Sequence, residues 1–81
     1  MKADEARFQE DLAETLRKAR TKAGKTQEAA AYESGISVRH LSDLERGVKS
    51  PNVKTLRRIS GVLGTKASAL LRTAENRASH L

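Results

Sequence analysis

The sequence predicts an all-α protein, a compact domain of five helices. Five segments of the 81-residue chain repeat apolar residues at helical spacing, and no segment alternates apolar and polar residues as a half-buried strand would. A domain of this size buries only about 60% of the surface that its unfolded chain exposes. We therefore expect a small core built from a few apolar residues of each helix.

The first expected helix ends at Gly24, because glycine is common just past a helix C-terminus. Its apolar residues recur three or four positions apart, so they form one stripe, and basic side chains lie off that stripe. The stripe consists of Phe8, Leu12, Leu16, Ala19 and Ala23.

Two short helices follow, joined by a turn at Gly35. Thr26 is expected to cap the first, which runs through Ser34, and Ser37 to cap the second, which runs to about Arg46. Helices joined so closely must cross at a small residue and cover apolar side chains. The sequence supplies these residues in Ala31, Ile36, Leu41 and Leu44. Residues 27–46 therefore predict a helix-turn-helix, whose second helix projects into the major groove of DNA.

Two more helices follow the loop of residues 48–51. Asn52 is expected to cap the fourth helix, which ends at Gly64. The inward residues of these two helices are expected to be Val53, Leu56, Ile59, Leu63, Ala67, Leu70 and Leu71. We divide the chain into residues 1–10, an N-terminal extension or the start of the first helix, a helix-turn-helix domain at 11–71, and a polar C-terminal tail at 72–81. The tail either frays or extends the last helix.

The charge of the chain favours a nucleic acid as its partner. The net charge is +6 and the isoelectric point is about 10.2. Residues 1–15 carry a net charge of −3, so the remaining residues carry +9 and the basic surface begins at Arg17. Only 2% of the residues are aromatic, which leaves few rings on which single-stranded bases could stack. Double-stranded DNA is the expected partner.

Several other classes of function are disfavoured. The chain has no cysteine and only two histidines, which lie far apart, so we expect no disulfide, no metal site and no cofactor. No nucleophile lies at a sensible spacing from a base and no glycine-rich loop could hold a phosphate, so we expect no enzyme. No apolar stretch approaches the length of a membrane span. We expect a cytoplasmic protein that associates with the nucleoid when bound to DNA.

The helix-turn-helix segment and its surroundings resemble the lambda-repressor and Cro-like family, also called the XRE family, over roughly residues 11 to 71. The matching motifs are Leu16–Arg20, Thr26–Glu28, Gly35–Ser37, Leu41–Gly47 and Pro51–Val53. The resemblance implies a sequence-specific transcriptional regulator that binds an inverted-repeat operator as a homodimer. Short relatives include restriction-modification controller proteins, phage repressors and antitoxins. The alternative is therefore an antitoxin or anti-repressor whose first partner is a toxin or another regulatory protein.

Three residues on the outward face of the second helix of the motif are predicted to read bases. Arg39 can donate to guanine O6 and N7, Val38 can pack on a thymine methyl group, and Asp43 can accept from cytosine N4. The alternative for Arg39 is an ion pair with Asp43 four residues on, which would also aim the guanidinium group.

A second set of residues is predicted to contact the DNA backbone. His40 and Ser42 flank the same helix. The resemblance implies a phosphate contact for Gln27 and a backbone grip for the stretch that follows the helix. This stretch contributes Arg46, Lys49, Ser50 and Asn52. For each of these residues the alternative is an ordinary solvated side chain.

The resemblance also implies two structural features. Arg20 and Glu45 are expected to form a partly buried ion pair between the first and third helices. Leu63, Leu70 and Leu71 are expected to take part in a two-fold interface, with membership of the core as the alternative.

The second helix departs from the family pattern. Lys25 stands where the family usually has an aliphatic residue, and Ala30 and Ser34 stand where it often has leucine. We expect the stem of Lys25, or the ring of Tyr32, to fill the resulting space.

Overall fold

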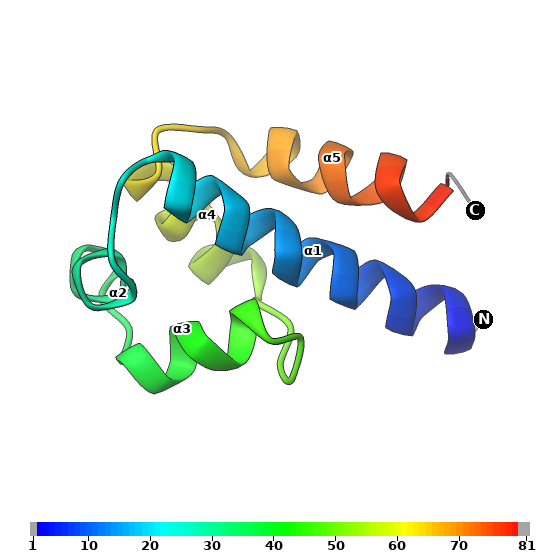
Figure 1. Ribbon diagram of the computed structural model, residues 1–81, viewed down its shortest axis with the longest axis horizontal. Coiled ribbons are helices and arrows are strands. Elements are labelled where there is room, and N and C mark those ends of the chain that lie inside the picture. The colour runs from blue at the N-terminus through cyan, green and yellow to red at the C-terminus, as the bar shows by residue number, and fades with distance from the viewer. Residues whose placement is uncertain (1, 80–81) are drawn as a thin grey trace.

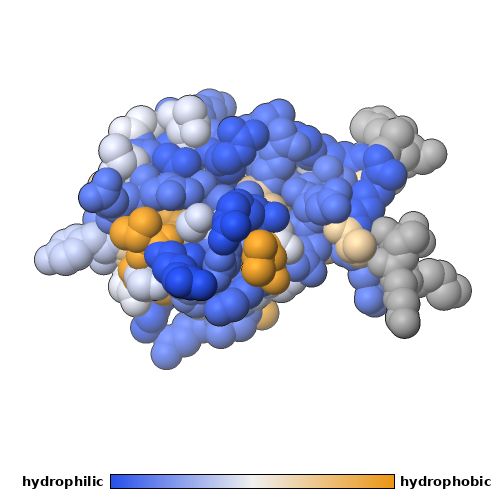
Figure 2. Space-filling view, turned by 60° about the horizontal axis from the view of Figure 1, so that its bottom comes forward, coloured by the Kyte–Doolittle hydropathy of each residue, from blue (hydrophilic) through white to orange (hydrophobic). Residues whose placement is uncertain are grey.

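The computed structural model describes residues 2–79, which form five α-helices without a strand. The helices are α1 (Lys2–Lys22), α2 (Gln27–Ser34), α3 (Val38–Glu45), α4 (Val53–Val62) and α5 (Ala67–Ser79). Figure 1 shows α1 and α5 side by side along the long axis, with α3 on the opposite side of α1 from α5. The face that carries α3 is mostly hydrophilic (Figure 2). The predicted all-α fold of five helices is confirmed.

The three predicted N-caps are confirmed. The side-chain oxygens of Thr26, Ser37 and Asn52 each accept a hydrogen bond from the main-chain N–H three residues further on, at 3.0, 3.0 and 2.8 Å. Each bond satisfies an N–H of the first helical turn that has no partner within the helix. The starts of α2, α3 and α4 are thus fixed by local sequence.

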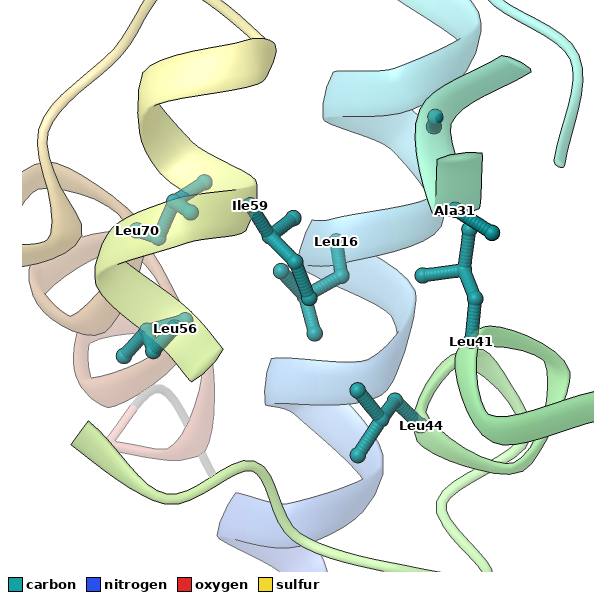
Figure 3. Close-up of a cluster of buried hydrophobic side chains, with 8 residues drawn as sticks. Leu16, Ala31, Leu41, Leu44, Leu56, Ile59 and Leu70 are labelled. Carbon is teal, nitrogen blue, oxygen red and sulfur yellow. The ribbon is translucent and has the colours of Figure 1, made fainter. Parts of the chain in front are cut away.

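The core lies where α1, α3 and α4 face one another. Leu16 of α1 sits near its centre, between Ile59 of α4 and the two leucines of α3, Leu41 and Leu44 (Figure 3). These four side chains are almost completely buried. Ala30 and Ala31 of α2 are 1% exposed, so α2 packs closely through small residues. The expected small, simple core is present.

The C-terminal tail extends the last helix, which is one of the two alternatives expected for it. Residues 72–79 continue it, and residues 2–10 form the first turns of α1. Ala74 is completely buried, and Arg77 reaches the acidic side chains of α1. The apolar pattern thins after Arg72 because the contacts there are made by one small residue and one charged residue. Residues 80–81 of the predicted tail lie outside the described part of the chain.

Two expectations about apolar packing were wrong, and one of the two alternatives for the space around α2 did not hold. Val53, predicted to face inward, is 74% exposed, whereas Thr55 and Leu56 of the same turn are buried, so the inward face of α4 begins after Val53. Ala23, placed on the inward stripe of α1, is exposed where that helix has already ended. Tyr32 does not fill the space around α2 and is 87% exposed. Lys25 is half-buried and its ammonium group lies 2.9 Å from Glu33, so its stem covers part of α2.

Candidate nucleic-acid interface

The α2–turn–α3 unit has the geometry of a helix-turn-helix. Gly35, which follows α2, has φ of +73°, the left-handed conformation that favours glycine. Its N–H and that of Ile36 bond back to carbonyls of α2, which closes the helix end. Leu41 and Leu44 hold the inner side of α3 against the core. The opposite side of α3 is left facing solvent.

The N-terminal part of α3 carries the two predicted base readers that the structure leaves exposed. Val38 is 42% exposed and Arg39 is exposed, and His40 and Ser42 beside them are half-buried. Figure 2 shows small, separate apolar areas on this otherwise hydrophilic face. A branched apolar side chain next to a guanidinium group can contact both a thymine methyl group and a guanine edge.

Asp43 does not lie on the exposed face of α3, which corrects the prediction that it belongs to the outward face of that helix. It is only 7% exposed. One carboxylate oxygen accepts a hydrogen bond from Arg46 at 2.6 Å, and the other lies 3.8 Å from the ammonium group of Lys49. Asp43 therefore pairs with Arg46 and Lys49, which follow α3, and not with Arg39. The reason is that the loop after α3 folds back over Asp43.

The loop after α3 presents most of the predicted backbone-contacting residues. Arg46, Lys49 and Ser50 are exposed, and the first two keep 63% of their side chains accessible. The side-chain oxygen of Asn52 caps α4, so its amide N–H groups are left for a phosphate. These residues lie on one continuous segment next to the exposed face of α3.

Two residues of this region were missed by sequence reasoning. Gln9 of α1 donates a hydrogen bond of 2.6 Å to the carbonyl oxygen of Gly47, which ties the loop to α1 across 38 positions. Val48 in the same loop is 59% exposed. An apolar residue in a basic loop was the only signal for Val48, and the distant partner of Gln9 gave no local signal.

Arg20 and Glu45 form the predicted ion pair, and it is buried. The guanidinium group donates two hydrogen bonds to the carboxylate, at 2.7 and 3.1 Å, and a third of 2.8 Å to the carbonyl oxygen of Lys25. The Glu45 side chain is 2% exposed and that of Arg20 is 16% exposed. Hydrogen bonding to Glu45 raises the pKa of the Arg20 guanidinium above its ordinary value. The end of α3 is thereby locked to the end of α1.

Gln27 also binds Glu45. Its amide nitrogen donates a hydrogen bond of 3.0 Å to the Glu45 carboxylate, so one of its two N–H groups is already used. Gln27 is half-buried at the first position of α2. The contact fixes the start of α2 relative to the end of α3, and leaves the second N–H group for a phosphate.

The three leucines assigned to a two-fold interface are not equivalent. Leu70 is 5% exposed and belongs to the core of the single chain, so almost none of its surface is left for a partner. Leu63 and Leu71 pack against that core and stay partly exposed.

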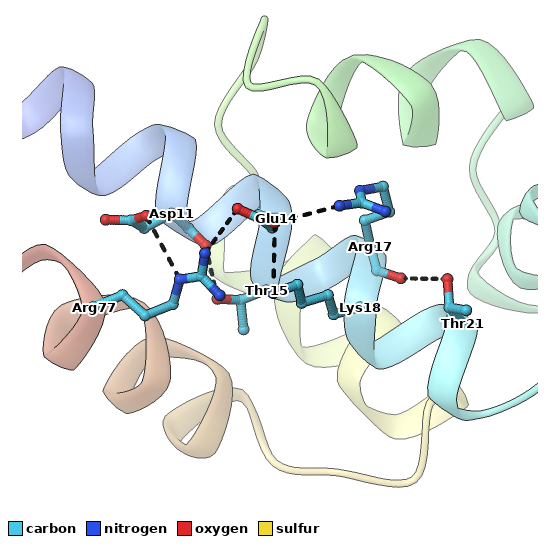
Figure 4. Close-up of polar contacts among 7 residues, drawn as sticks. All are labelled: Asp11, Glu14, Thr15, Arg17, Lys18, Thr21 and Arg77. Atoms are coloured by element: carbon cyan, nitrogen blue, oxygen red, sulfur yellow. Dashed lines mark hydrogen bonds and ion pairs between the residues drawn. The ribbon is translucent and has the colours of Figure 1, made fainter.

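A separate charged cluster joins α1 to α5, away from α3 (Figure 4). Arg77 lies 2.7 Å from Glu14 and 3.6 Å from Asp11. Arg77 first, and then Lys18, lower the pKa of Glu14 below its ordinary value. The acidic part of α1 is thus compensated by α5 and lies apart from the basic residues around α3.

Residues 2–79 contain no group of three or more metal-ligating side chains suited to a metal ion. Within the same residues, no helix has both the length and the apolar character that crossing a membrane requires.

Comparisons with known proteins agree with this geometry. A family model described as helix-turn-helix matches residues 16–70. Two crystal structures of the clp gene regulator ClgR from Corynebacterium glutamicum are similar to the chain. The first has a TM-score of 0.84 at 30% identity over 89% of this chain and 77% of that one. The second has a TM-score of 0.80 at 31% identity over 86% and 91%. No curated protein matches the sequence. The chain belongs to the XRE family of helix-turn-helix proteins and is a DNA-binding transcriptional regulator.

Proposed function

We propose that the protein regulates transcription by binding an inverted-repeat operator in double-stranded DNA as a homodimer, with Val38 and Arg39 reading bases. The observation that carries the proposal is the exposure of both side chains at the N-terminal end of a helix whose other end is locked by the buried Arg20–Glu45 pair. A rigidly held helix presents its side chains to a groove with little loss of freedom. The similar protein ClgR is itself described as a gene regulator, which supports this reading.

Contacts to phosphates supply most of the affinity in this proposal and no choice of sequence. The residues proposed for this role are Gln27, His40, Ser42, Arg46, Lys49, Ser50 and Asn52. If a dimer makes roughly eight to ten such contacts, the slope of log K against log salt is about −7 to −9.

The two-fold interface is proposed to lie on α4 and α5 and to include the exposed parts of Leu63 and Leu71. Dimerisation sets the separation of the two copies of α3, and so the separation of the half-sites, at about one helical turn of DNA. In a cell, the protein is proposed to reside in the cytoplasm and to associate with the nucleoid through its operators.

The test is selection of bound duplexes from a random pool by the purified protein at near-physiological salt. Enrichment of an inverted repeat with half-sites about one turn apart is the expected result. Arg39→Ala should lose a guanine preference at one position of each half-site, whereas the control Arg7→Ala, which removes an exposed arginine of α1, should keep the full motif. A pool without any motif would contradict autonomous sequence recognition.

The second candidate is an antitoxin or anti-repressor that binds a toxin or another regulatory protein and uses DNA to regulate its own synthesis. The 87% exposure of Tyr32 on α2 favours it, because exposed aromatic residues are enriched at protein interfaces. Loss of partner binding in Tyr32→Ala with unchanged DNA binding would support this candidate. Family membership favours a binding role over an enzymatic one in both cases.

A further inference from the structure

Asp43 is an acidic residue placed among the side chains that approach DNA. A carboxylate near the phosphate backbone repels it. Between Ser37 and Ser50 the other acid is Glu45, whose side chain is 2% exposed and paired with Arg20. A base-reading role does not account for Asp43, because its side chain is only 10% exposed. Its position therefore calls for another role.

Two cations lie close to this carboxylate. Arg46 donates a hydrogen bond of 2.6 Å to Oδ1, and the ammonium group of Lys49 lies 3.8 Å from Oδ2. Both cations keep 63% of their side chains accessible while Asp43 is covered. We call these three residues the Asp43 cluster. Its net charge is +1, and its positive groups face outward.

The main chain of Asp43 holds the same loop. Its carbonyl oxygen accepts hydrogen bonds from the N–H groups of Val48 and Lys49, at 2.9 and 3.3 Å. Gln9 holds the neighbouring Gly47 from the other side. Asp43 therefore holds the backbone of the loop through its main chain, and the charged ends of the two cations through its side chain.

We propose that Asp43 is a positioning residue for DNA binding, which holds Arg46 and Lys49 toward the phosphates of a correctly docked duplex and limits their binding to any other duplex. The proposal rests on the proposed function for the direction from which DNA approaches. It replaces base reading by Asp43 with control of two backbone contacts.

The chemistry of the two cations fits this role. A guanidinium group has five N–H donors and an ammonium group has three, so each can remain paired with Asp43 and still donate to a phosphate. If the cations left Asp43 for arbitrary phosphates, its charge would stay covered and unpaired beside a polyanion, which is unfavourable. The pairing therefore favours the docking geometry in which Arg46 and Lys49 bind Asp43 and the phosphates at the same time.

The experiment measures binding of the full chain to a random duplex of about 20 base pairs and to the operator from the pool selection, between about 50 and 300 mM salt. For Asp43→Asn, which frees both cations, affinity for the random duplex should rise about fivefold at the lowest salt and the salt slope should steepen by about 0.9 per protomer. The ratio of operator to random affinity should fall about tenfold, because the orientation is lost. An unchanged slope and ratio would overturn the proposal.

The control Glu14→Gln removes one carboxylate that pairs with an arginine on the α1–α5 side, and so matches the change in net charge. It should leave the ratio of affinities unchanged. An equal fall in this control would mean that total charge, rather than Asp43, sets the ratio, and would overturn the proposal.

Two further variants separate position from charge and from folding. Asp43→Glu keeps the charge but moves it by one methylene group, so the salt slope should stay and the ratio should fall; a ratio equal to that of the unchanged protein would overturn the proposal. In a chain that already carries Arg46→Gln and Lys49→Gln, Asp43→Asn should no longer change the ratio. A fall of the same size in that background would show that Asp43 acts without these cations.

The outcomes also separate this proposal from the function on which it rests. If the unchanged protein binds no duplex or yields no operator, the proposed function fails. If it binds its operator and the Asp43 variants behave like it, only the positioning role fails.

Discussion

Helix α1 is joined to α3 and to α5 by ion pairs of different kinds. Near its C-terminal end, Arg20 binds Glu45 of α3 through two short hydrogen bonds in a buried site. Nearer its middle, Glu14 and Asp11 meet Arg77 of α5 at a site where a third of the Arg77 side chain stays exposed. The first pair fixes α3 of the helix-turn-helix against α1, and the second fixes α5 against α1.

This difference in burial teaches that an ion pair acts on stability mainly through what its loss leaves behind. A covered charge without its partner is strongly destabilising, whereas an exposed one returns to water. The helix-turn-helix side of the protein should therefore be sensitive to the loss of one charge, and the α1–α5 side should tolerate it.

The largest expected effect is on the buried pair. Arg20→Ala should lower the free energy of unfolding by about 3 kcal/mol, because Glu45 is left charged, 2% exposed and bonded only to Gln27. Urea denaturation followed by circular dichroism measures it. The control Arg17→Ala removes an exposed arginine of the same helix that also pairs with a glutamate, and should change stability little. Equal losses of unfolding free energy in Arg20→Ala and Arg17→Ala would contradict the distinction between buried and exposed ion pairs.

The second test concerns the turn at Gly35, which precedes α3, whereas the buried pair holds the last residue of that helix. Gly35→Ala should lower the free energy of unfolding by about 1 kcal/mol, because φ of +73° is strained for alanine. The control Gly61→Ala lies in α4, with ordinary helical backbone and nothing within 4 Å of an added methyl group. It should instead raise stability by about 0.5 to 1 kcal/mol. Urea denaturation followed by circular dichroism measures both changes, and equal signs would contradict the structure of the turn.

The smallest effect is expected at the exposed cluster. Arg77→Ala should lower the unfolding midpoint slightly at neutral pH, and less at high salt, because exposed pairs are screened. Arg77 lowers the pKa of Glu14, so the contribution is present above the ordinary pKa of a glutamate and is lost as pH falls through the lowered value. Midpoints of the unchanged and variant proteins from about pH 7 to about pH 3 should therefore converge on the acid side. A constant difference across this range would show that Arg77 acts by packing.

Much of the fold could be predicted from the sequence because its signals are local. The caps at Thr26, Ser37 and Asn52 and the left-handed Gly35 act within three or four residues, so a single sequence contains both partners of each contact. The apolar spacing of α1, α3 and α4 gave the core leucines, because helical periodicity selects one face of each helix. The pair of Arg20 with Glu45 was expected only through the resemblance to a family, since its partners are 25 positions apart.

The tertiary structure alone decided the contacts that periodicity cannot give. Arg39 and Asp43 are four residues apart and share a side of an ideal helix, but the loop that returns over Asp43 covers one and leaves the other exposed. Arg77 binds Glu14, which is 63 positions away, and no local sequence pattern predicts this contact. The sequence by itself therefore determined where α2, α3 and α4 begin and which leucines of α1, α3 and α4 form the core. Which polar side chains of α3 remain free for DNA depends on how a distant loop packs, and only the folded chain decides that.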